Sequence, residues 1–478
     1  MESVIKHKWI YLFALVFIGL NAFLVFQDNY YLNALPFALI IVYMAFFHIE
    51  QTFLLVAFLT PISVNLEEFT EGRIGLFLPT EPILFGLMLL IIMKQLKSPF
   101  IPRYVWNHPI TWSLAFYLFW VFITSITSTH PIVSFKFLLM KSWFIIPLLL
   151  LGVKVFSNPK NIERFLWLFT SAMMLIIGYT LSRHAGYNFG EKEGHWVMEP
   201  FYKDHTIYGA GVAIQVFFVL GLYLYKKHSA IIQFVLLSFF IVTLIGLYFS
   251  YTRGAWLSVI VALMVWFFIH YKVKFKWLLT VALGVLAIVA VSWTEIQFAL
   301  AKNRSEHTTE EFSERMKSTT NVTSDASNLE RLNRWSAAWR MFEEKPVFGF
   351  GPSTYAFEYA PYQDPDKLTI ISTNFGDGGN AHSEYLGPLA EMGLIGFLAV
   401  LIFVSVLFYK GITLYIRMPK SEDQLKRLLL FLILAAVTYF FHGILNNYLD
   451  TDKAAVPIYS ICAIIIALEQ FIDKKYAA

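Results

Sequence analysis

Long apolar runs alternate with short polar segments along most of this chain. Runs of about 20 residues match the length that an α-helix needs to cross a bilayer, and the strict alternation typical of membrane β-barrel strands is missing. We therefore predict an all-α fold, a polytopic transmembrane bundle of about 12–14 helices. The expected spans lie near residues 9–26, 31–48, 51–64, 82–93, 110–127, 134–153, 162–182, 206–225, 231–249, 255–271, 276–293, 385–409, 427–446 and 454–472.

One long polar stretch, residues 294–384, interrupts this series of spans. It divides the chain into N-terminal transmembrane helices (1–293), a loop outside the membrane (294–384) and C-terminal transmembrane helices (385–478). Within the loop, residues 328–342 place apolar side chains at intervals of three and four. This spacing predicts an amphipathic helix that lies on the membrane or against the bundle. We expect the chemistry of the protein to take place in this loop.

The composition is that of an integral membrane protein. The 478 residues are 57% hydrophobic and 15% charged, whereas soluble domains average about 25% charged residues. The formal net charge is +4, but the lysines and arginines fall mainly in alternate loops, as in the positive-inside pattern. We therefore expect both termini in the cytoplasm, the long loop on the opposite side, and no nucleic-acid partner. The single cysteine, Cys462, excludes an intrachain disulfide and a cysteine-based metal site.

Arg253 lies on the side of the membrane that the positive-inside rule disfavours, in Ser250-Tyr-Thr-Arg253-Gly-Ala255 between two spans. An unpaired arginine at the membrane boundary is costly unless its side chain reaches the interface. Arg253 is therefore either an interfacial anchor beside Trp256 or a ligand for an anion. The guanidinium group is chemically suited to the second role, because its planar donors match phosphate oxygens and stay charged.

Two further arginines on this side, Arg331 and Arg334, belong to the predicted amphipathic helix. They are either a solvated helix face or additional anion ligands. The helix is followed by Pro346 and by Gly349-Phe-Gly351, a combination typical of a tight turn. A single Gly-x-Gly is weak evidence for phosphate binding, and we interpret it as a place where the chain reverses.

Candidate proton acceptors occur on the same side. His382 follows Gly378-Gly-Asn-Ala at the start of a span. It is either a hydrogen-bonded structural residue or a general base, because an ordinary pKa of about 6.5 suits proton transfer at neutral pH. Asp204, His205 and Tyr208 open the span at 206–225, where Asp204 either caps the helix or orients an acceptor.

These segments, in this order, resemble the O-antigen ligase and polymerase superfamily. The similarity extends from about Asp204 to Val406, and Ser383 departs from it, since many relatives have asparagine after the histidine. The matching segments are Ser250-Tyr-Thr-Arg253-Gly-Ala255, then Arg331-x-x-x-Trp335 followed by Pro346 and Gly349-Phe-Gly351, and finally His382-Ser-Glu-Tyr-Leu386 leading to Glu391-Met-Gly-Leu-Ile-Gly396.

The resemblance implies a membrane glycosyltransferase that moves a glycan from polyprenyl (undecaprenyl) diphosphate to an acceptor hydroxyl. The expected reaction is O-antigen ligation to lipid A-core in lipopolysaccharide biosynthesis, in the bacterial inner membrane with the site facing the periplasm. It implies that Arg253 and Arg331 bind the diphosphate and that His382 is the base of an inverting reaction that needs no metal or other cofactor. The remaining candidates for substrate binding are Arg334, Asp204, His205 and Tyr208.

Several alternatives stay open. Within the superfamily, the chain could be a polymerase of repeat units or a protein O-oligosaccharyltransferase, and His205 is an alternative base. A transporter or flippase would have a similar number of helices, but it predicts charged residues in the middle of spans. We expect charges such as Lys136 and Lys141 near the start of a span, which argues against a transporter.

Overall fold

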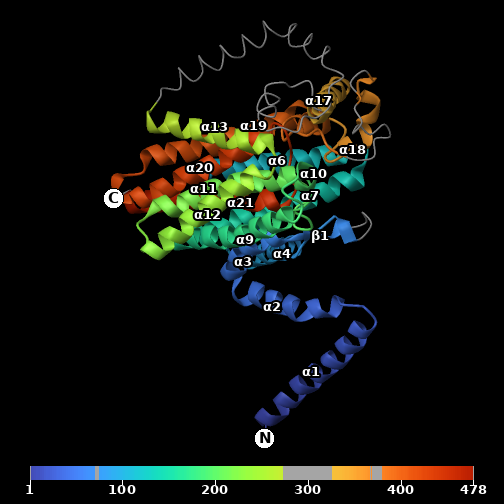
Figure 1. Cartoon of the computed structure of the whole chain (residues 1–478), viewed down its shortest axis with the longest axis vertical. Coiled ribbons are helices and arrows are strands. Elements are labelled where there is room, and N and C mark those ends of the chain that lie inside the picture. Colours follow the sequence, from blue (N-terminus) through green and yellow to red (C-terminus); the bar gives the residue numbers. More distant parts are fainter. Residues whose placement is uncertain (1, 70–74, 273–325, 366–367, 369–378, 477–478) are drawn as a thin grey trace. The chain divides into compact units, whose positions relative to one another are not determined.

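Figure 1 shows a computed structural model of the chain. The predicted span at 276–293 and the predicted loop up to residue 325 lie outside the residues that the structure describes. The chain divides into two compact units, residues 1–53 and 54–478, which we describe separately. The described residues are 2–69, 75–272, 326–365, 368 and 379–476.

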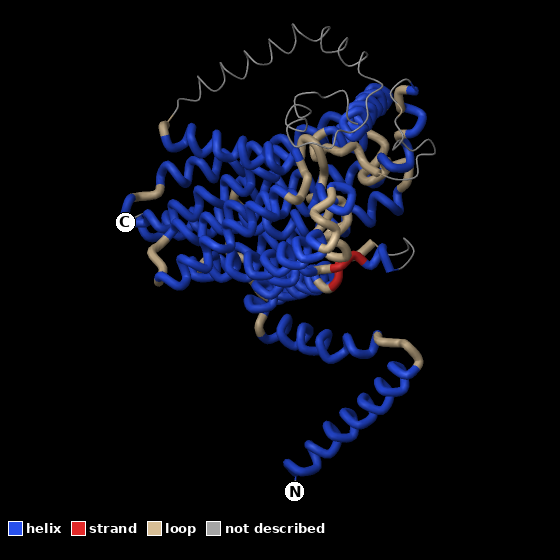
Figure 2. The backbone as a smooth tube through the Cα atoms, viewed as in Figure 1, coloured by secondary structure: helices blue, strands red, loops and turns tan. Residues whose placement is uncertain are grey.

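Helices make up nearly all the regular structure of the described residues, and Figure 2 shows one small hairpin of strands. In this hairpin β1 (Val64–Asn65) pairs antiparallel with β2 (Phe77–Leu78). The helices are α1 (Glu2–Phe26), α2 (Ala34–Phe47), α3 (Ile49–Ile62), α4 (Thr80–Lys97), α5 (Arg103–Trp106), α6 (Pro109–Ile126), α7 (Pro131–Ile145), α8 (Gly152–Phe156), α9 (Pro159–Ala185), α10 (Glu191–Gly194), α11 (His205–Tyr225), α12 (Ala230–Tyr248), α13 (Arg253–His270), α17 (Ala326–Glu344), α18 (Tyr355–Glu358), α19 (Leu386–Arg417), α20 (Asp423–His442) and α21 (Asp452–Tyr476).

Within the described ranges, 10 helices are long and apolar enough to cross a membrane. Two others, Tyr31–Phe47 and Ile49–Ile62, are apolar but shorter. Helix α4 has 18 residues and carries Glu81, Lys94 and Lys97. Every predicted span in the described ranges therefore corresponds to a helix, which confirms the all-α polytopic fold.

The span that contains α7 and α8 runs without interruption from Pro131 to Phe156 and includes a π-helical turn, Ile146–Leu151. Pro147 lies in this turn and has no N–H to donate to the preceding turn, so the helical hydrogen bonding widens locally. The sequence predicts Lys141 near the start of this span, and this prediction is wrong. Lys141 lies towards the middle and is buried.

In the N-terminal unit, α2 and the part of α1 from Trp9 onward are apolar on nearly all sides. The structure shows α2 with no buried residue among those described, and large side chains such as Phe37 and Phe47 are exposed. Exposed apolar surface of this extent fits a lipid surrounding, where helices satisfy their own backbone hydrogen bonds.

Helices α11 and α21 form the centre of the unit 54–478, and 83% of the apolar window of each is buried. Around α11 lie α9, α12, α13 and α20. By contrast, α12 and α13 bury 22% of their windows, which leaves apolar faces for lipid. The residues that begin α11 are therefore held by helices on several sides.

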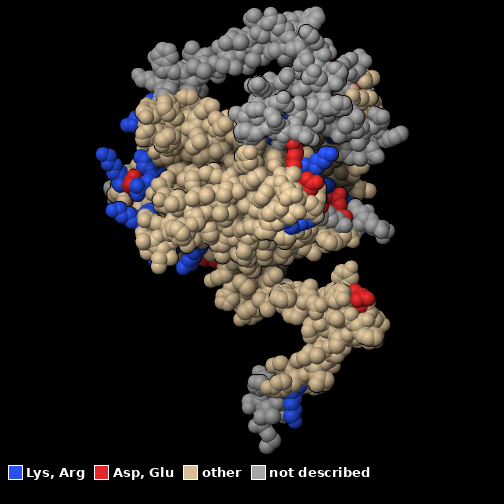
Figure 3. Space-filling model, viewed as in Figure 1, with Lys and Arg blue, Asp and Glu red and all other residues tan. Residues whose placement is uncertain are grey.

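Charged side chains gather towards the two ends of the main unit on the face that Figure 3 shows, with an apolar band between them. Loops predicted on the cytoplasmic side lie together: Lys94 and Lys154 lie over the ring of Phe100, at 5.7 and 3.7 Å from its centroid. Arg427 donates to the carbonyl oxygen of Tyr225 at 3.2 Å. This grouping agrees with the predicted alternation of loops, and the side that faces the cytoplasm stays a prediction.

Candidate active site

Arg253 and Arg331 lie on elements that contact the same segment, the α20–α21 connection (residues 443–451). Arg331 on α17 donates through Nε to the carbonyl oxygen of Leu445 at 3.3 Å. Gly254, directly after Arg253, lies against this segment, because a Cβ atom there would be 3.2 Å from Leu445 Cδ1. Leu445 thus contacts both arginine-bearing elements.

Glu384 joins the His382 segment to the α20–α21 connection through hydrogen bonds. Its N–H donates to the carbonyl oxygen of Gly443 at 2.8 Å. Its carboxylate Oε1 accepts from the N–H groups of Tyr448 and Leu449 at 2.7 and 2.9 Å. Sequence reasoning did not assign a role to Glu384, and the available signal was its place two residues after the histidine. All three motifs therefore converge on one connection.

Arg253 is the first residue of α13, and the preceding Thr252 fixes where this helix begins. Thr252 Oγ1 donates to the carbonyl oxygen of His205 at 2.7 Å. Gly209 permits this contact, because a Cβ atom there would be 2.7 Å from Thr252 Cβ. The starts of α11 and α13 are therefore joined, and Arg253 is half-buried beside them.

Helix α17 is the predicted amphipathic helix, but its buried face is partly polar. Arg334 is 5% exposed, and its Nε lies 2.7 Å from Glu330 Oε1. Its Nη1 donates to the carbonyl oxygen of Asn380 at 3.0 Å, and a Cβ on Gly379 would be 2.2 Å from this nitrogen. Trp339, one of the apolar residues at the predicted spacing, is 50% exposed. Pairing offsets the cost of burying the two charges, so this face can pack against the bundle.

His382 lies beside the two arginines of α17 in an unusual backbone conformation. Its φ of +47° is in the left-handed region, and its N–H donates to Asn380 Oδ1 at 2.9 Å. Such conformations concentrate at functional sites. Burial, followed by the charges of Arg334 and Arg331, lowers the pKa of His382 from 6.5 to about 4. The imidazole is therefore neutral at neutral pH and able to accept a proton.

Asp204 caps α11, which confirms one of its two interpretations. Its Oδ1 accepts from the N–H groups of Thr206 and Ile207 at 2.7 and 3.1 Å. The Thr206 hydroxyl in turn bonds to the hydroxyl of Tyr448 in the α20–α21 connection. The charge of Asp204 also acts on His382, where it opposes the arginines. The cap therefore joins α11 to the same region as the arginines.

His205 and Tyr208 take different positions on α11. The ring of His205 stacks on that of His195, with centroids 4.1 Å apart. Tyr208 is buried further along the helix and meets Tyr202 edge to face at 5.6 Å. His205 lies at the candidate site, whereas Tyr208 packs in the interior of the bundle.

Helix α19, which follows the His382 segment, is broken at Gly393, where φ is 67° and ψ is −168°. A break of this kind frees backbone groups that need other partners. The bonds that satisfy them are Leu394 N–H to Pro346 O (2.9 Å), Phe350 N–H to Ala390 O (3.3 Å), Gly351 N–H to Glu391 O (2.8 Å) and Trp120 Nε1–H to Met392 O (2.9 Å). We call these four bonds the kink clamp.

The glycines of the Gly349-Phe-Gly351 motif allow the close approach in the kink clamp. A Cβ atom on Gly349 would be 2.3 Å from the carbonyl carbon of Glu391. Likewise, a Cβ atom on Gly393 would be 2.2 Å from the carbonyl oxygen of Val347. The motif therefore packs directly against the backbone of α19.

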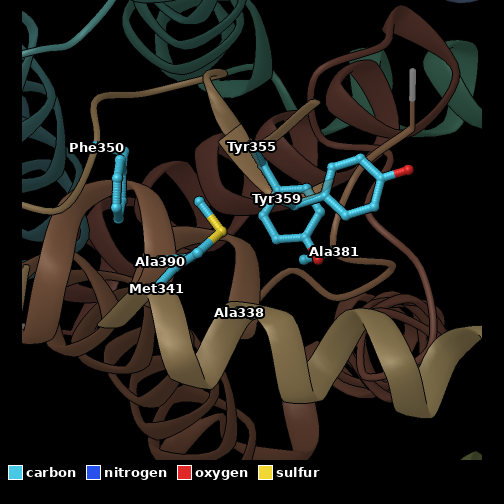
Figure 4. Packing of buried hydrophobic residues seen from close by; sticks show 7 residues of the cluster. All are labelled: Ala338, Met341, Phe350, Tyr355, Tyr359, Ala381 and Ala390. Atoms are coloured by element: carbon cyan, nitrogen blue, oxygen red, sulfur yellow. The ribbon is translucent and has the colours of Figure 1, made fainter. Parts of the chain in front are cut away.

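An apolar cluster holds α17 against these segments, as Figure 4 shows. The hydroxyl of Tyr355 also donates to the backbone oxygen of Arg334 at 2.8 Å. The cluster fixes the arginine-bearing helix relative to the histidine segment and to α19. Its buried members are Ala338, Met341, Phe350, Tyr355, Tyr359, Ala381 and Ala390.

The arrangement combines cationic side chains with a neutral, partly buried imidazole. The charge of Arg331 acts on both His382 and His205, so these groups lie within electrostatic reach of one another. Guanidinium groups in such a site are suited to a phosphorylated ligand, and the imidazole is suited to general-base chemistry.

Comparison with known proteins relates part of the chain to one protein family. The family model described as O-antigen ligase matches residues 236–401, which include Arg253, Arg331 and His382. An uncharacterized protein of Haemophilus influenzae is 28% identical over 167 residues, and this similarity covers 34% of the chain. The chain spans 39% of the length of that relative.

Proposed function

We propose, from its membership of the O-antigen ligase and polymerase superfamily, that this chain transfers a glycan from polyprenyl (undecaprenyl) diphosphate to an acceptor hydroxyl. The coarse class, a polytopic membrane glycosyltransferase of the ligase and polymerase type, is that of the matching family. The finer assignment that we propose is O-antigen ligation to lipid A-core, with polymerisation of repeat units as the alternative. Other glycan acceptors, or a protein, would use the same chemistry.

In the proposed reaction, Arg253 and Arg331 bind the diphosphate of the donor. The acceptor oxygen attacks the anomeric carbon from the face opposite the diphosphate, and the bond from this carbon to the diphosphate oxygen breaks. The electron pair of that bond stays on the diphosphate, where negative charge grows. Two guanidinium groups at this position stabilise the charge in the transition state. The anomeric configuration is inverted.

His382 accepts the proton of the attacking hydroxyl. The lowered pKa keeps its imidazole unprotonated before substrate binds. Because the charges of Arg334 and Arg331 contribute to this lowering, a bound diphosphate would offset them and raise the basicity of His382. The base would therefore become stronger when the donor is in place.

The other candidates support these groups. Arg334 is a positioning residue, because it holds Asn380 and the turn that carries His382. Asp204 positions the start of α11. His205 is an alternative base, since it lies at the same site. Tyr208 has the weakest case for substrate contact, since it is buried away from the arginines.

We further propose that the chain lies in the bacterial inner membrane with both termini in the cytoplasm. The donor lipid then enters from the surrounding bilayer, and transfer takes place on the periplasmic side. The positive-inside distribution supports this orientation, as does the grouping of the basic loops away from Arg253 and Arg331.

The observation that carries the proposal is the convergence of Arg253, Arg331 and His382 on the α20–α21 connection. We would reconstitute the protein with a polyprenyl-diphosphate glycan and with lipid A-core, and measure transfer. Arg253→Ala, Arg331→Ala and His382→Ala should each lower kcat at least about 100-fold, as loss of one transition-state group typically does.

Arg340→Ala is the matched control, because Arg340 is an exposed arginine on the same helix as Arg331. It should transfer at the wild-type rate. Folded Arg253→Ala or Arg331→Ala protein with wild-type kcat would remove that residue from the diphosphate site. Undiminished transfer by His382→Ala would remove it as the base. Transfer only to a second lipid-linked repeat unit would make the protein a polymerase.

A further inference from the structure

A polar cavity of about 100 Å³ lies beside the His382 segment, and neither His382 nor any residue of α17 is among the residues that line it. Space of this size accommodates several water-sized groups, such as the hydroxyls of one ring. The cavity is bounded by α6, α7, α19, the turn at Asn380 and the α20–α21 connection. The polar lining residues that matter most for the argument are Lys141, Asn447, Asp450, Glu384 and Glu391.

Three of these groups face the cavity without a satisfying partner in the described part of the chain. Lys141 is 4% exposed, its ammonium lies 5.2 Å from the centroid of the Phe137 ring, and its charge acts on Asp450, Glu384 and Glu391, but no hydrogen bond or ion pair of this ammonium is formed with the described residues. Asn447 Oδ1 is buried without a hydrogen bond. The carboxylate of Asp450 accepts from its own backbone N–H, and no side chain described here bonds to it. Buried polar groups normally have partners, so these require an explanation.

The other two carboxylates are already used by the fold. Glu384 accepts from the N–H groups of Tyr448 and Leu449. Glu391 accepts from the N–H groups of Ser353 and Tyr355 at 2.9 and 3.0 Å. They contribute negative charge to the cavity wall, but they do not need a ligand. The groups available to a ligand are therefore one ammonium, one carboxylate and one amide oxygen.

These groups select a neutral ligand that is rich in hydroxyls. Hydroxyl groups donate to the oxygens of Asp450 and Asn447 and accept from Lys141, so one ligand can satisfy all three. An anion would be repelled by Asp450, Glu384 and Glu391. A cation would be attracted by these carboxylates, but it would leave the ammonium of Lys141 without a hydrogen-bond acceptor.

We propose that this cavity binds a neutral saccharide ring through Lys141, Asn447 and Asp450. The nature of the ligand rests on the proposed function, since a glycan transferase handles such rings on both its donor and its acceptor. The cavity borders Asn380 and Ser383, which flank His382, so a ring held here lies next to the proposed base.

Steady-state kinetics of the reconstituted protein test the site. Lys141→Met and Asp450→Asn should each raise one KM about tenfold with kcat within about twofold of wild type, because each removes one ground-state hydrogen-bonding group. A rise in the acceptor KM assigns the ring to the acceptor, and a rise in the donor KM assigns it to the donor. Lys136→Met is the control, since Lys136 is exposed on the same helix.

The proposal is wrong if Lys141→Met and Asp450→Asn both fold and both leave the KM of each substrate unchanged, whether or not kcat is reduced. Asn447→Ala replaces either variant if it does not fold, with the same expected rise in KM.

A binding experiment separates this proposal from the proposed function, because it needs no transfer. Wild-type protein in nanodiscs is mixed with methyl glucoside, methyl galactoside or methyl N-acetylglucosaminide, and with glucuronate as an anionic probe, and saturation-transfer NMR is recorded. We expect signal from at least one neutral glycoside, and loss of that signal in Asp450→Asn. No signal from any neutral probe, an equal signal in the variant, or a stronger signal from glucuronate would contradict the assignment, whether or not transfer is observed.

Discussion

Replacement of Gly393 by alanine should open the kink clamp. The φ of 67° and ψ of −168° at this position belong to a region that is nearly exclusive to glycine, and another residue there costs about 1–3 kcal/mol. The new Cβ would also lie 2.2 Å from the oxygen of Val347 and 2.6 Å from that of Pro346. Both are backbone atoms, so the residues before Gly349 must withdraw.

The withdrawal breaks the bond from Leu394 N–H to Pro346 O, which contributes about 1 kcal/mol net. The backbone strain and the lost bond together lower the free energy of local opening by about 2–4 kcal/mol. Hydrogen exchange therefore accelerates by about 30- to 700-fold. Hydrogen exchange of the protein in nanodiscs, followed by mass spectrometry, measures this in peptides that contain Gly351 and Leu394. Transfer should also fall, because the clamp holds the segments that flank α17.

Gly387→Ala is the matched control in the same helix. A Cβ atom there would meet its nearest neighbour, Ala381 Cβ, at 3.9 Å, an ordinary contact distance. Its exchange and transfer rates should equal those of the wild type. If the exchange of Gly351 and Leu394 is also unchanged in Gly393→Ala, the kink does not depend on the clamp, and the reasoning is wrong.

Three further predictions concern the site itself. Because His382 must be neutral to accept a proton and its pKa is lowered to about 4, kcat/KM should stay level down to about pH 5 and fall as the pH drops further; a midpoint near its ordinary pKa of about 6.5 would contradict this. Arg334→Met removes a charge that lowers the pKa of His382, so the acid limb of kcat/KM should move to higher pH, and an unmoved limb would exclude the effect. In Gly209→Ala, the new Cβ would displace Thr252 and with it Arg253, so transfer should fall at least about tenfold while the protein remains folded. Wild-type transfer by this variant would show that Arg253 tolerates the displacement.

Much of the architecture could be predicted from the sequence. Apolar runs long enough to cross a bilayer dictate helices, because no other element satisfies its backbone within one segment. The motifs also identified Arg253, Arg331 and His382, whose elements the structure brings to one connection. The sequence between these residues did not predict how they are arranged relative to one another in space.

The α20–α21 connection could not be predicted as their meeting point. The bonds of Glu384 to Tyr448 and Leu449 join residues more than 60 positions apart, which periodicity cannot reveal. The apolar spacing of α17 also did not reveal which residues are buried, since the fold buries the Arg334–Glu330 pair and leaves Trp339 50% exposed. Pairing of this kind is decided by tertiary contacts, not by the identity of a residue.

Lys141 illustrates the same limit at the scale of one helix. Apolar windows locate the ends of a span poorly, so the charge was expected close to the membrane surface. The span begins earlier and ends later than expected, and Lys141 lies inside it, facing the polar cavity. The argument against a transporter therefore no longer rests on this lysine.

The place in the sequence of the residues that form the kink clamp has a consequence for biogenesis. Ribosomes build the chain from the N-terminus, and the four partners of the broken turn, on Trp120, Pro346, Phe350 and Gly351, all precede α19 in the sequence. They already exist when α19 enters the lipid, where an exposed peptide group has no water to bind. A nascent chain that has been translated only as far as Arg417 can therefore form all four bonds of the kink clamp before α20 and α21 are synthesised.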